Sequence, residues 1–380
     1  MEKENLDALV CRLPENVVFL SGYWPLNGWS FLAFPREGKP VCIVPHCEEK
    51  EAREELWDAD CVSFLFGVLA AGNPYREIKN ALIDISAGKN WTHIGYEGDF
   101  ESVAPPWNAA EPAIPAETTR NLFKEVFGRE SLVDATGFLI SQRSCKTSYE
   151  IEKLRIVNEI SAFGLKTFFE LVAPGISGVE IVAEVEQAVM KQGTGYKGAK
   201  RVRAFAQVST GVEETAAGFR PMVISSARNL ESGDSALIEM GVVADGFWSD
   251  RTRFSVAGKH TEQQARIFEI IKSAQEAAIA QVRSGVTAGE VDEAARAIIR
   301  DAGYEREFLH VTGHGLGFRY HEPVPLICPG SDFVLEAGMV HTAEPGIYSP
   351  EIGGFRLEDN VVVTEDGCEV LGPAAKDFIF

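Results

Sequence analysis

The sequence Gly175-Ile-Ser-Gly-Val-Glu180 recurs in altered form as Gly285-Val-Thr-Ala-Gly-Glu290, and this repetition predicts a fold with two similar halves. Each stretch places a hydroxyl three residues before a glutamate, which is the capping-box pattern that opens a helix. Each helix is expected to stop at a glycine, Gly193 in the first copy and Gly303 in the second. Starts and stops are both 110 residues apart (285 − 175 and 303 − 193). Residues 146–380 therefore contain two copies of one structural unit.

A further helix precedes each repeated helix, and strands follow it. Thr147 and Glu150 form another capping box, and the apolar positions after it predict a helix that ends at Pro174-Gly175. The second copy has a cap at Thr261 and a predicted helix over 262–282. Two such halves that pack sheet to sheet would bring their strands to one cleft. The predicted strands cover 204–208, 236–240, 247–256, 339–344 and 355–363.

The first 140 residues alternate strands and helices, which predicts a smaller α/β domain. Residues 142–148 are the predicted linker, so we expect two domains, 1–140 and 146–380. The N-terminal part carries no recognisable catalytic constellation. Its predicted strands cover 8–11, 17–20, 31–34, 40–44 and 93–96, and its predicted helices cover 48–56 and 75–85.

Composition excludes several classes of protein. Hydrophobic residues make up 45% and charged residues 24% of the 380 positions, as in ordinary soluble globular proteins. The net charge of -20 argues against nucleic acid or an anionic membrane as partner, because both require a basic surface. The seven cysteines are scattered without a CxxC pair, which indicates reduced thiols in a cytoplasmic protein. We expect no signal peptide at the acidic start, and the longest apolar run is too short to span a bilayer.

Five acidic or imidazole side chains lie on apolar or glycine-rich segments of the repeated region. The hairpin signal Asp245-Gly246 lies between two of the acids and would bring their strands side by side. The other two acids have the same relation across the turn 350–354. Buried carboxylates this close repel one another by several kcal/mol unless they are neutralised. Two divalent metal ions about 3.5–4 Å apart would neutralise them, bridge a water and polarise a carbonyl. The five residues are Glu239, Asp250, His314, Glu344 and Glu358.

Simpler interpretations exist for each residue taken alone. One acid on a strand is usually a solvated side chain, and Asp250 could form an ion pair with Arg251 or Arg253. His310 and His314 are spaced four apart, but the glycines between and after them predict a loop and not a zinc-binding helix. The metal interpretation rests on the occurrence of all five residues together within the two repeated units.

Several short motifs of the repeated region resemble those of the pita-bread metallopeptidase family, which includes methionine aminopeptidase, Xaa-Pro aminopeptidase, prolidase and a metal-free creatinase branch. The resemblance covers the chain from about Lys146, and the segment before it resembles the N-terminal domain of the prolidase, Xaa-Pro aminopeptidase and creatinase members. It implies an α+β fold with a C-terminal pita-bread domain, and a homodimer. The motifs that carry it are Ser249–Arg253, His310–Gly317 with His321-Glu322, Thr342–Gly346 and Gly354–Asp359.

The resemblance also implies roles for the site residues. The metals would be two Mn, Co or Zn ions, held by Asp250, His314, Glu344 and Glu358, with Glu239 at the fifth ligand position. Glu344 would also carry a proton from the bridging water to the leaving nitrogen. His321 would donate to the tetrahedral oxyanion, and His310 would shape the substrate pocket. Arg356 would hold Glu358 or the carboxylate of the substrate.

Two departures from the family pattern bear on function. Metal-dependent members have Asp where this chain has Glu239, and the extra methylene extends the carboxylate by roughly 1.5 Å. Because metal sites tolerate about 0.2 Å of error, the backbone retreats, one metal subsite is shifted or weakened, or Glu239 does acid/base work. Members that cleave Xaa-Pro bonds also carry a histidine after the loop at Thr210-Gly211, whereas residues 204–237 contain none here.

Three functions therefore remain open. The first is a dinuclear metallohydrolase of the Xaa-Pro peptidase type, in which a metal-bound water attacks an amide carbonyl of a small peptide. The second is a creatinase-like hydrolase of a non-peptide C–N bond, metal-free or with a single metal. The third is a non-catalytic binding module on the same fold. Metal content measured beside a substrate screen discriminates among them.

Overall fold

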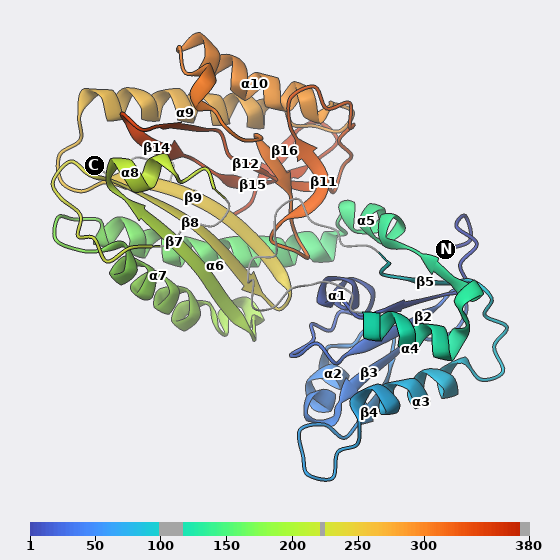
Figure 1. Cartoon of the computed structure of the whole chain (residues 1–380). Coiled ribbons are helices and arrows are strands. Elements are labelled where there is room, and N and C mark those ends of the chain that lie inside the picture. The colour runs from blue at the N-terminus through green and yellow to red at the C-terminus, as the bar shows by residue number, and fades with distance from the viewer. Residues whose placement is uncertain (99–116, 221–224, 373–380) are drawn as a thin grey trace. The chain divides into compact units, whose positions relative to one another are not determined.

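The computed structural model describes residues 1–98, 117–220 and 225–372. The chain divides into two compact units, Met1–Arg143 and Ser144–Phe380, which Figure 1 shows from blue to green and from green to red. This division falls inside the segment 142–148 that the sequence predicts as linker. The segment is not an extended linker, however, because helix α5 (Thr136–Ser144) ends within it and helix α6 (Ser148–Leu171) begins at its last residue.

The N-terminal unit is built on one mixed sheet in the order β4-β3-β2-β1-β5-β6. Strand β2 is antiparallel to both of its neighbours, whereas the remaining pairs are parallel. The strands are β1 (Ala8–Cys11), β2 (Phe31–Pro35), β3 (Val41–Pro45), β4 (Asp60–Phe64), β5 (Ile94–Tyr96) and β6 (Leu132–Asp134). The other helices are α1 (Pro14–Ser21), α2 (Glu49–Glu55), α3 (Pro74–Ser86) and α4 (Glu117–Phe127).

One predicted strand of this unit is wrong, because residues 17–20 belong to helix α1. Pro14 stands at the first position of the helix, where its fixed φ favours helix formation and its missing N–H costs nothing. The carboxylate of Glu97, far away in sequence, accepts hydrogen bonds from the backbone N–H groups of Arg12 and Leu13, both at 2.9 Å. Hydrogen bonds supplied over such a sequence distance leave no local pattern.

The C-terminal unit contains the predicted duplication. Its first half holds α6, α7 (Gly178–Gly193), β7 (Val202–Thr210), α8 (Gly211–Ala216), β8 (Ser235–Ala244) and β9 (Phe247–Val256). Its second half begins with α9 (Glu262–Gln281) and α10 (Ala288–Asp301). The strands that follow are β10 (Gly313–Gly315), β11 (Glu322–Ile327), β12 (Val340–Ala343), β13 (Gly346–Ser349), β14 (Gly353–Arg356), β15 (Asp359–Val363) and β16 (Cys368–Val370). Reciprocal capping boxes open α6, α7 and α10, as predicted.

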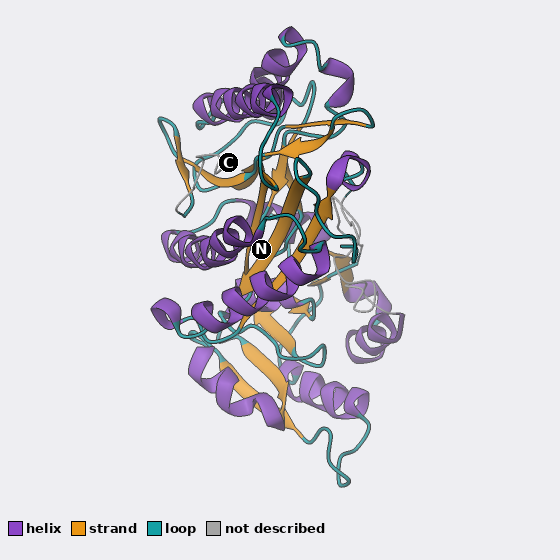
Figure 2. Cartoon of the chain, turned by 90° about the vertical axis from the view of Figure 1, so that its left-hand side faces the viewer, coloured by secondary structure: helices purple, strands orange, loops and turns teal. Residues whose placement is uncertain are grey.

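Strands of this unit lie between two helical layers (Figures 1 and 2). Helices α6 and α7 pack on β7, β8 and β9, which form a three-stranded sheet. Helices α9 and α10 pack on the strands of the second half, which form the sheet β11-β10-β12-β15-β16 and the hairpin β13-β14. A buried apolar cluster that includes Phe254, Ile271 and Phe355 joins strands of both halves to the helices α9 and α10.

The two halves meet where β9 lies beside β15. The backbone N–H of Asp250 donates to Oδ1 of Asn360 at 3.0 Å, and the Asn360 amide donates back to the carbonyl of Asp250 at 2.6 Å. These two residues are 110 positions apart, the same spacing as the helix repeat. Corresponding positions of the two copies are therefore in contact, and the acid-bearing strands of both halves converge here.

Local turn chemistry sets the register of the two halves. Asp245 and Gly246 both have positive φ, 50° and 90°, as the predicted hairpin requires. The predicted strand 355–363 is instead two strands, because β14 ends at Arg356 and β15 begins at Asp359. Between them the backbone N–H of Glu358 donates to the carbonyl of Thr252 on β9 at 3.1 Å.

Two chain-wide observations complete the description. None of the helices in the described ranges combines the length and the apolar character needed to cross a bilayer. Among the same residues, which include all seven cysteines, no disulfide is formed.

Candidate metal centre

The two acids of the first half share one face of the β8–β9 ladder. Glu239 pairs with Thr252 and Gly241 pairs with Asp250, so the two acids are diagonal neighbours across the ladder. The side chain of Asp250 is buried, and that of Glu239 is 12% exposed. The predicted convergence of these carboxylates is present.

The second half contributes an imidazole and two carboxylates. His314 lies on β10 between two glycines, Glu344 directly follows β12, and Glu358 lies in the break between β14 and β15. The register pairs Ala343 with Asp359, so Glu344 and Glu358 sit where these neighbouring strands meet. Potential ligand atoms of His314, Glu344 and Glu358 all lie within 4.8 Å of one another.

His314 connects this group to Asp250. Its Nε2 lies 3.4 Å from Oδ2 of Asp250 and 3.5 Å from Oε1 of Glu344. Its Nδ1 lies 2.9 Å from the carbonyl of Gly315. A carbonyl can only accept, so Nδ1 carries a hydrogen and Nε2 faces the carboxylates, which is the usual arrangement of a metal-binding histidine.

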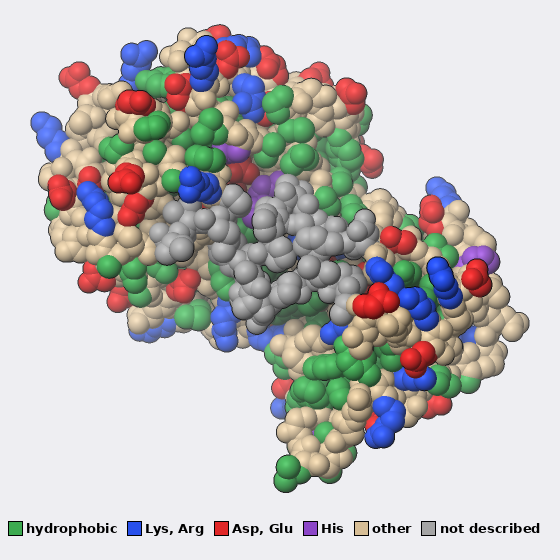
Figure 3. Space-filling model, viewed as in Figure 1, with side chains coloured by type: hydrophobic (Ala, Val, Ile, Leu, Met, Phe, Trp, Pro, Cys, Tyr) green, Lys and Arg blue, Asp and Glu red, His purple; other side chains and the backbone are tan. Residues whose placement is uncertain are grey.

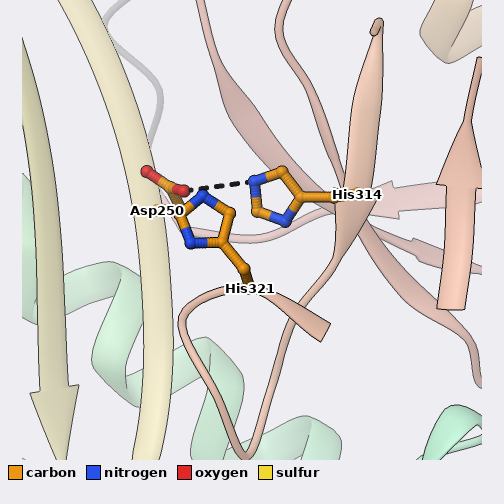
Figure 4. A group of neighbouring side chains, drawn as sticks. All are labelled: Asp250, His314 and His321. Atoms are coloured by element: carbon orange, nitrogen blue, oxygen red, sulfur yellow. Dashed lines mark ion pairs between the residues drawn. The ribbon is translucent and has the colours of Figure 1, made fainter. Parts of the chain in front are cut away.

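His321, from the segment between β10 and β11, joins the same place. Its potential ligand atom lies within 4.8 Å of those of Asp250 and His314, and the two imidazole centroids are 4.3 Å apart. Figure 4 shows the three side chains turned towards one another. Figure 3 shows histidine side chains reaching the surface on one face of this unit.

The electrostatics of the site are those of several carboxylates buried away from water. Burial raises the pKa of Glu358 well above its usual range, and the charges of Asp250 and Glu344 add to this. Burial likewise raises the pKa of Asp250. Burial alone would lower the pKa of His314, but the hydrogen bond that its ring donates to Asp250 and the charges of the neighbouring acids outweigh this effect, and the pKa rises to about 9. The site attracts positive charge strongly.

These residues fit a divalent metal ion. One imidazole and several carboxylates are nitrogen and oxygen donors of the kind that divalent metal ions bind. One further observation is independent of residue type: Oε1 of Glu358 is buried and accepts no hydrogen bond in the described structure. A buried carboxylate oxygen without a partner is costly, and an ion at this position would satisfy it.

Glu239 lies outside both of these groups in the part of the chain that the structure describes. Its Oε2 accepts from Nη2 of Arg356 at 2.7 Å, and its Oε1 accepts from the hydroxyl of Tyr320 at 2.9 Å. Burial raises the pKa of Glu239 to about 7, although the charge of Arg356 opposes this. The resemblance implied that Arg356 would hold Glu358 or the carboxylate of the substrate. Its Nε lies 3.8 Å from Oε2 of Glu358, and its shortest bond to a carboxylate is the one from Nη2 to Glu239.

His310 is tied to neighbouring side chains. Its Nδ1 lies 2.7 Å from the carbonyl of Val311, so this nitrogen carries the hydrogen and Nε2 accepts from Tyr348 at 3.0 Å. The Tyr348 hydroxyl in turn accepts from Arg356 at 2.8 Å. Burial lowers the pKa of His310 to about 4, which keeps the ring neutral. Glu344 lies 3.9 Å from His310, beyond hydrogen-bond distance.

Sequence reasoning missed two residues that touch the acids. Thr252 donates to Oε2 of Glu358 at 2.6 Å, and the hydroxyl of Tyr320 lies within hydrogen-bond distance of both acids of the first half. Thr252 could have been found, because it lies two positions after Asp250 on the same strand face and opposite Glu239. Tyr320 carries no such signal, since its loop becomes a neighbour of β8 only in the folded chain.

Such a cluster, on two duplicated halves, defines a metal-dependent hydrolase of the α+β class. Residues 152–365 match the family model described as metallopeptidase family M24, and residues 1–145 match the creatinase/prolidase N-terminal domain. The chain therefore belongs to metallopeptidase family M24, and the predicted resemblance and the pita-bread fold are confirmed.

The relatives are similar over their whole length. The Xaa-Pro dipeptidase of Pyrococcus furiosus is 31% identical, with 100% of this chain and 97% of that protein covered. The Xaa-Pro dipeptidase of Lactobacillus delbrueckii subsp. lactis is 30% identical, with 98% of each covered. Among solved structures, the prolidase of Pyrococcus horikoshii OT3 superposes with a TM-score of 0.80 at 28% identity, covering 100% of this chain and 97% of that one.

Proposed function

We propose that this chain is a metal-dependent peptidase of the Xaa-Pro dipeptidase type. The observation that carries the proposal is the convergence of Asp250, His314, Glu344 and Glu358, with one buried oxygen of Glu358 that has no hydrogen-bond partner among the residues the structure describes. Relatives named Xaa-Pro dipeptidase align with nearly the whole chain, which supports the substrate class.

A bound divalent ion would polarise the amide carbonyl and acidify the attacking water. Asp250, His314, Glu344 and Glu358 would hold it, and Mn, Co and Zn are the ions that suit these donors. The hydrogen on Nδ1 of His314 is fixed by the carbonyl of Gly315, so Nε2, which faces Asp250 and Glu344, is the nitrogen that would bind the ion.

Glu344 is the residue that we assign to proton transfer. Its Oε1 accepts from the hydroxyl of Thr342 at 3.0 Å, which fixes the orientation of the carboxylate. Its Oε2 has no hydrogen bond with His310 at 3.9 Å. One oxygen is thus held in place while the other can take a proton from water and pass it to the leaving nitrogen.

His321 is the residue that we assign to the oxyanion. Burial and the charge of His314 lower its pKa well below the usual range, so the ring is neutral and carries one N–H donor. An N–H aimed at the developing negative charge stabilises the transition state more than the ground state. His310 is bonded to Val311 and Tyr348, so we assign it to the wall of the substrate pocket.

An assay of Xaa-Pro dipeptides with added Mn²⁺ tests the proposal. Wild type should release proline, a chelator should abolish the activity, and Asp250→Ala or His314→Ala should lower kcat/KM by at least about a thousandfold, as expected when metal chemistry is lost. Asp366→Asn, a change at an exposed acid, is the control. Full activity without metal on a non-peptide C–N bond would instead favour a creatinase-like hydrolase. Elution volume and light scattering would test the homodimer that the family resemblance implies.

A further inference from the structure

A phenol hydroxyl connects the two acids of the first half. Tyr320 lies 2.9 Å from Oε1 of Glu239 and 2.8 Å from Oδ1 of Asp250, both at hydrogen-bond distance. In a site with two metals, both acids would have to turn these oxygens to the second ion. Here the hydroxyl of a side chain from a different loop lies between them.

The ring of Tyr320 fits there because β8 has a glycine at the facing position. A Cβ added to Gly241 would lie 2.5 Å from Cε2 of the tyrosine ring. Gly241 pairs with Asp250 and lies two positions after Glu239 on the same face of β8. The ring therefore covers the strand surface between the two acids.

Arg356 forms a hydrogen bond with the other carboxylate oxygen of Glu239. Its Nη2 donates to Oε2 at 2.7 Å, and its Nη1 donates to the carbonyl of Gly218 and the hydroxyl of Tyr348. The guanidinium is thus a fixed positive charge on this side of the site. A cavity of ≈ 10 Å³ lined by Glu239, Arg356 and Gly218, among others, is at the lower limit for a single water.

Repulsion between positive charges points the same way. Four carboxylates (Glu239, Asp250, Glu344 and Glu358) converge on the site. Arg356 already supplies one fixed positive charge beside Glu239, and the hydroxyl of Tyr320 lies between Glu239 and Asp250 at hydrogen-bond distance from both. A second divalent ion would lie against the guanidinium and would have to displace the phenol, so repulsion opposes it.

We propose that the centre holds one divalent ion, at His314, Glu344, Glu358 and Oδ2 of Asp250, and that Tyr320 and Arg356 take the place of a second ion beside Glu239. The proposal rests on the metal-dependent function above and replaces the two ions predicted from the sequence. Glu239 is then a positioning residue that anchors Arg356 and Tyr320 and is not a metal ligand.

Metal stoichiometry of the full chain tests this directly. Protein stripped with a chelator is loaded with Mn²⁺ and freed of excess, and bound Mn per chain is measured by elemental analysis. Electron paramagnetic resonance then distinguishes an isolated Mn²⁺ from a spin-coupled pair. Wild type should hold one uncoupled ion per chain. Tyr320→Val, which removes both ring and hydroxyl, should admit a second, coupled ion, whereas Tyr149→Val, at an exposed tyrosine, should keep one.

A second variant, Glu239→Gln, tests the one-ion proposal even if Tyr320→Val does not fold. If Glu239 is not a ligand, this variant should still hold one ion, with affinity within a few-fold of wild type. Two ions in wild type, or loss of an ion in Glu239→Gln, would overturn the proposal while leaving the peptidase function intact. One ion in Tyr320→Val, in folded protein, would overturn the role of the tyrosine. No ion in wild type would overturn both this proposal and the proposed function.

Discussion

The hydroxyl of Thr252 donates a 2.6 Å hydrogen bond to Oε2 of Glu358, and Nε of Arg356 donates to the same hydroxyl at 2.9 Å. Because a threonine of the first half orients a carboxylate of the second, the two halves build the centre jointly. The other oxygen of Glu358 has no hydrogen bond within the described part of the chain, so Thr252 determines which oxygen is presented to an ion.

Thr252→Val should therefore weaken metal binding without removing a ligand. Loss of a residue that orients a ligand typically costs 10–100-fold in metal affinity, and we expect a loss of about that size. Mn²⁺ titration by calorimetry measures it. Thr364→Val, at an exposed threonine just after β15, is the control and should bind as wild type. Unchanged affinity in Thr252→Val would show that the hydrogen bond does not position Glu358.

The glycines on either side of His314 should resist substitution. A Cβ at Gly313 would lie 2.0 Å from the carbonyl oxygen of Thr342, and one at Gly315 would lie 2.1 Å from that of Val324. Backbone atoms cannot move aside as the end of a side chain can, so Gly315→Ala should displace β10 together with its histidine.

We expect Gly315→Ala to destabilise the chain by about 1–3 kcal/mol, the usual cost of overpacking, and to lower metal affinity as well. Chemical denaturation and Mn²⁺ titration measure the two effects. Gly367→Ala is a matched control, because no heavy atom lies within 4 Å of its added Cβ. Equal stability of the two alanine variants would contradict the prediction.

Asp359 holds two buried arginines at the seam between the halves. Its Oδ1 accepts from Arg251 at 3.0 Å and from Arg253 at 2.6 Å, and all three side chains are almost completely buried. Burial lowers the pKa of Arg251 to about 10, against the opposing charge of Asp359. The pairs join β9 to β15, so they stabilise the contact that brings the acids of both halves together.

Asp359→Asn should leave two buried guanidinium groups without a counter-charge and cost about 3–5 kcal/mol, the usual penalty for breaking a buried ion pair. Urea denaturation of the full chain measures the loss. Asp366→Asn makes the same chemical change at an exposed position and should have little effect. A loss below about 1 kcal/mol in Asp359→Asn would mean that the arginines find other partners.

Patterns that are local in sequence predicted most of the C-terminal unit. Capping boxes such as Ser177 with Glu180 join neighbours along the chain, and Asp245-Gly246 fixes the β8–β9 register through its own backbone. The duplication then placed Asp250 near the acids of the second half. These features need no knowledge of tertiary contacts, so the sequence alone contains them.

Features that depend on distant contacts were not predictable. Glu239 bonds Arg356, which is 117 residues away in the sequence, and Tyr320, which is 81 residues away. No periodic pattern around either partner predicts its contact with Glu239. The sequence shows Glu239 where metal-dependent members of the family have Asp, and this difference suggested that one metal subsite is altered. Which of the three possible consequences applies depends on Tyr320, whose position only the folded chain shows.

Glu97 gives the N-terminal unit a pH dependence with a defined sign. Burial raises its pKa from 4.5 to about 7, although Asn16 and the N–H groups of Arg12 and Leu13 all donate to it. The unfolded chain, with the lower pKa, loses its proton first as pH rises. Between pH 4.5 and about 7 the folded state therefore binds more protons, and stability falls as pH rises through that window.

The fall attributable to Glu97 should amount to about 3 kcal/mol across the window, at 1.36 kcal/mol for each pKa unit. Glu97→Gln keeps an oxygen to accept from Leu13 and Asn16 but cannot titrate, so its stability should stay nearly flat over the same pH range. Denaturation of the full chain, with hydrogen exchange of the α1 amides as a local readout, measures both proteins. Glu2→Gln, at an exposed acid, should keep the wild-type slope. An equal slope in Glu97→Gln would place the titrating group elsewhere, since only the removal of the buried carboxyl distinguishes the two variants.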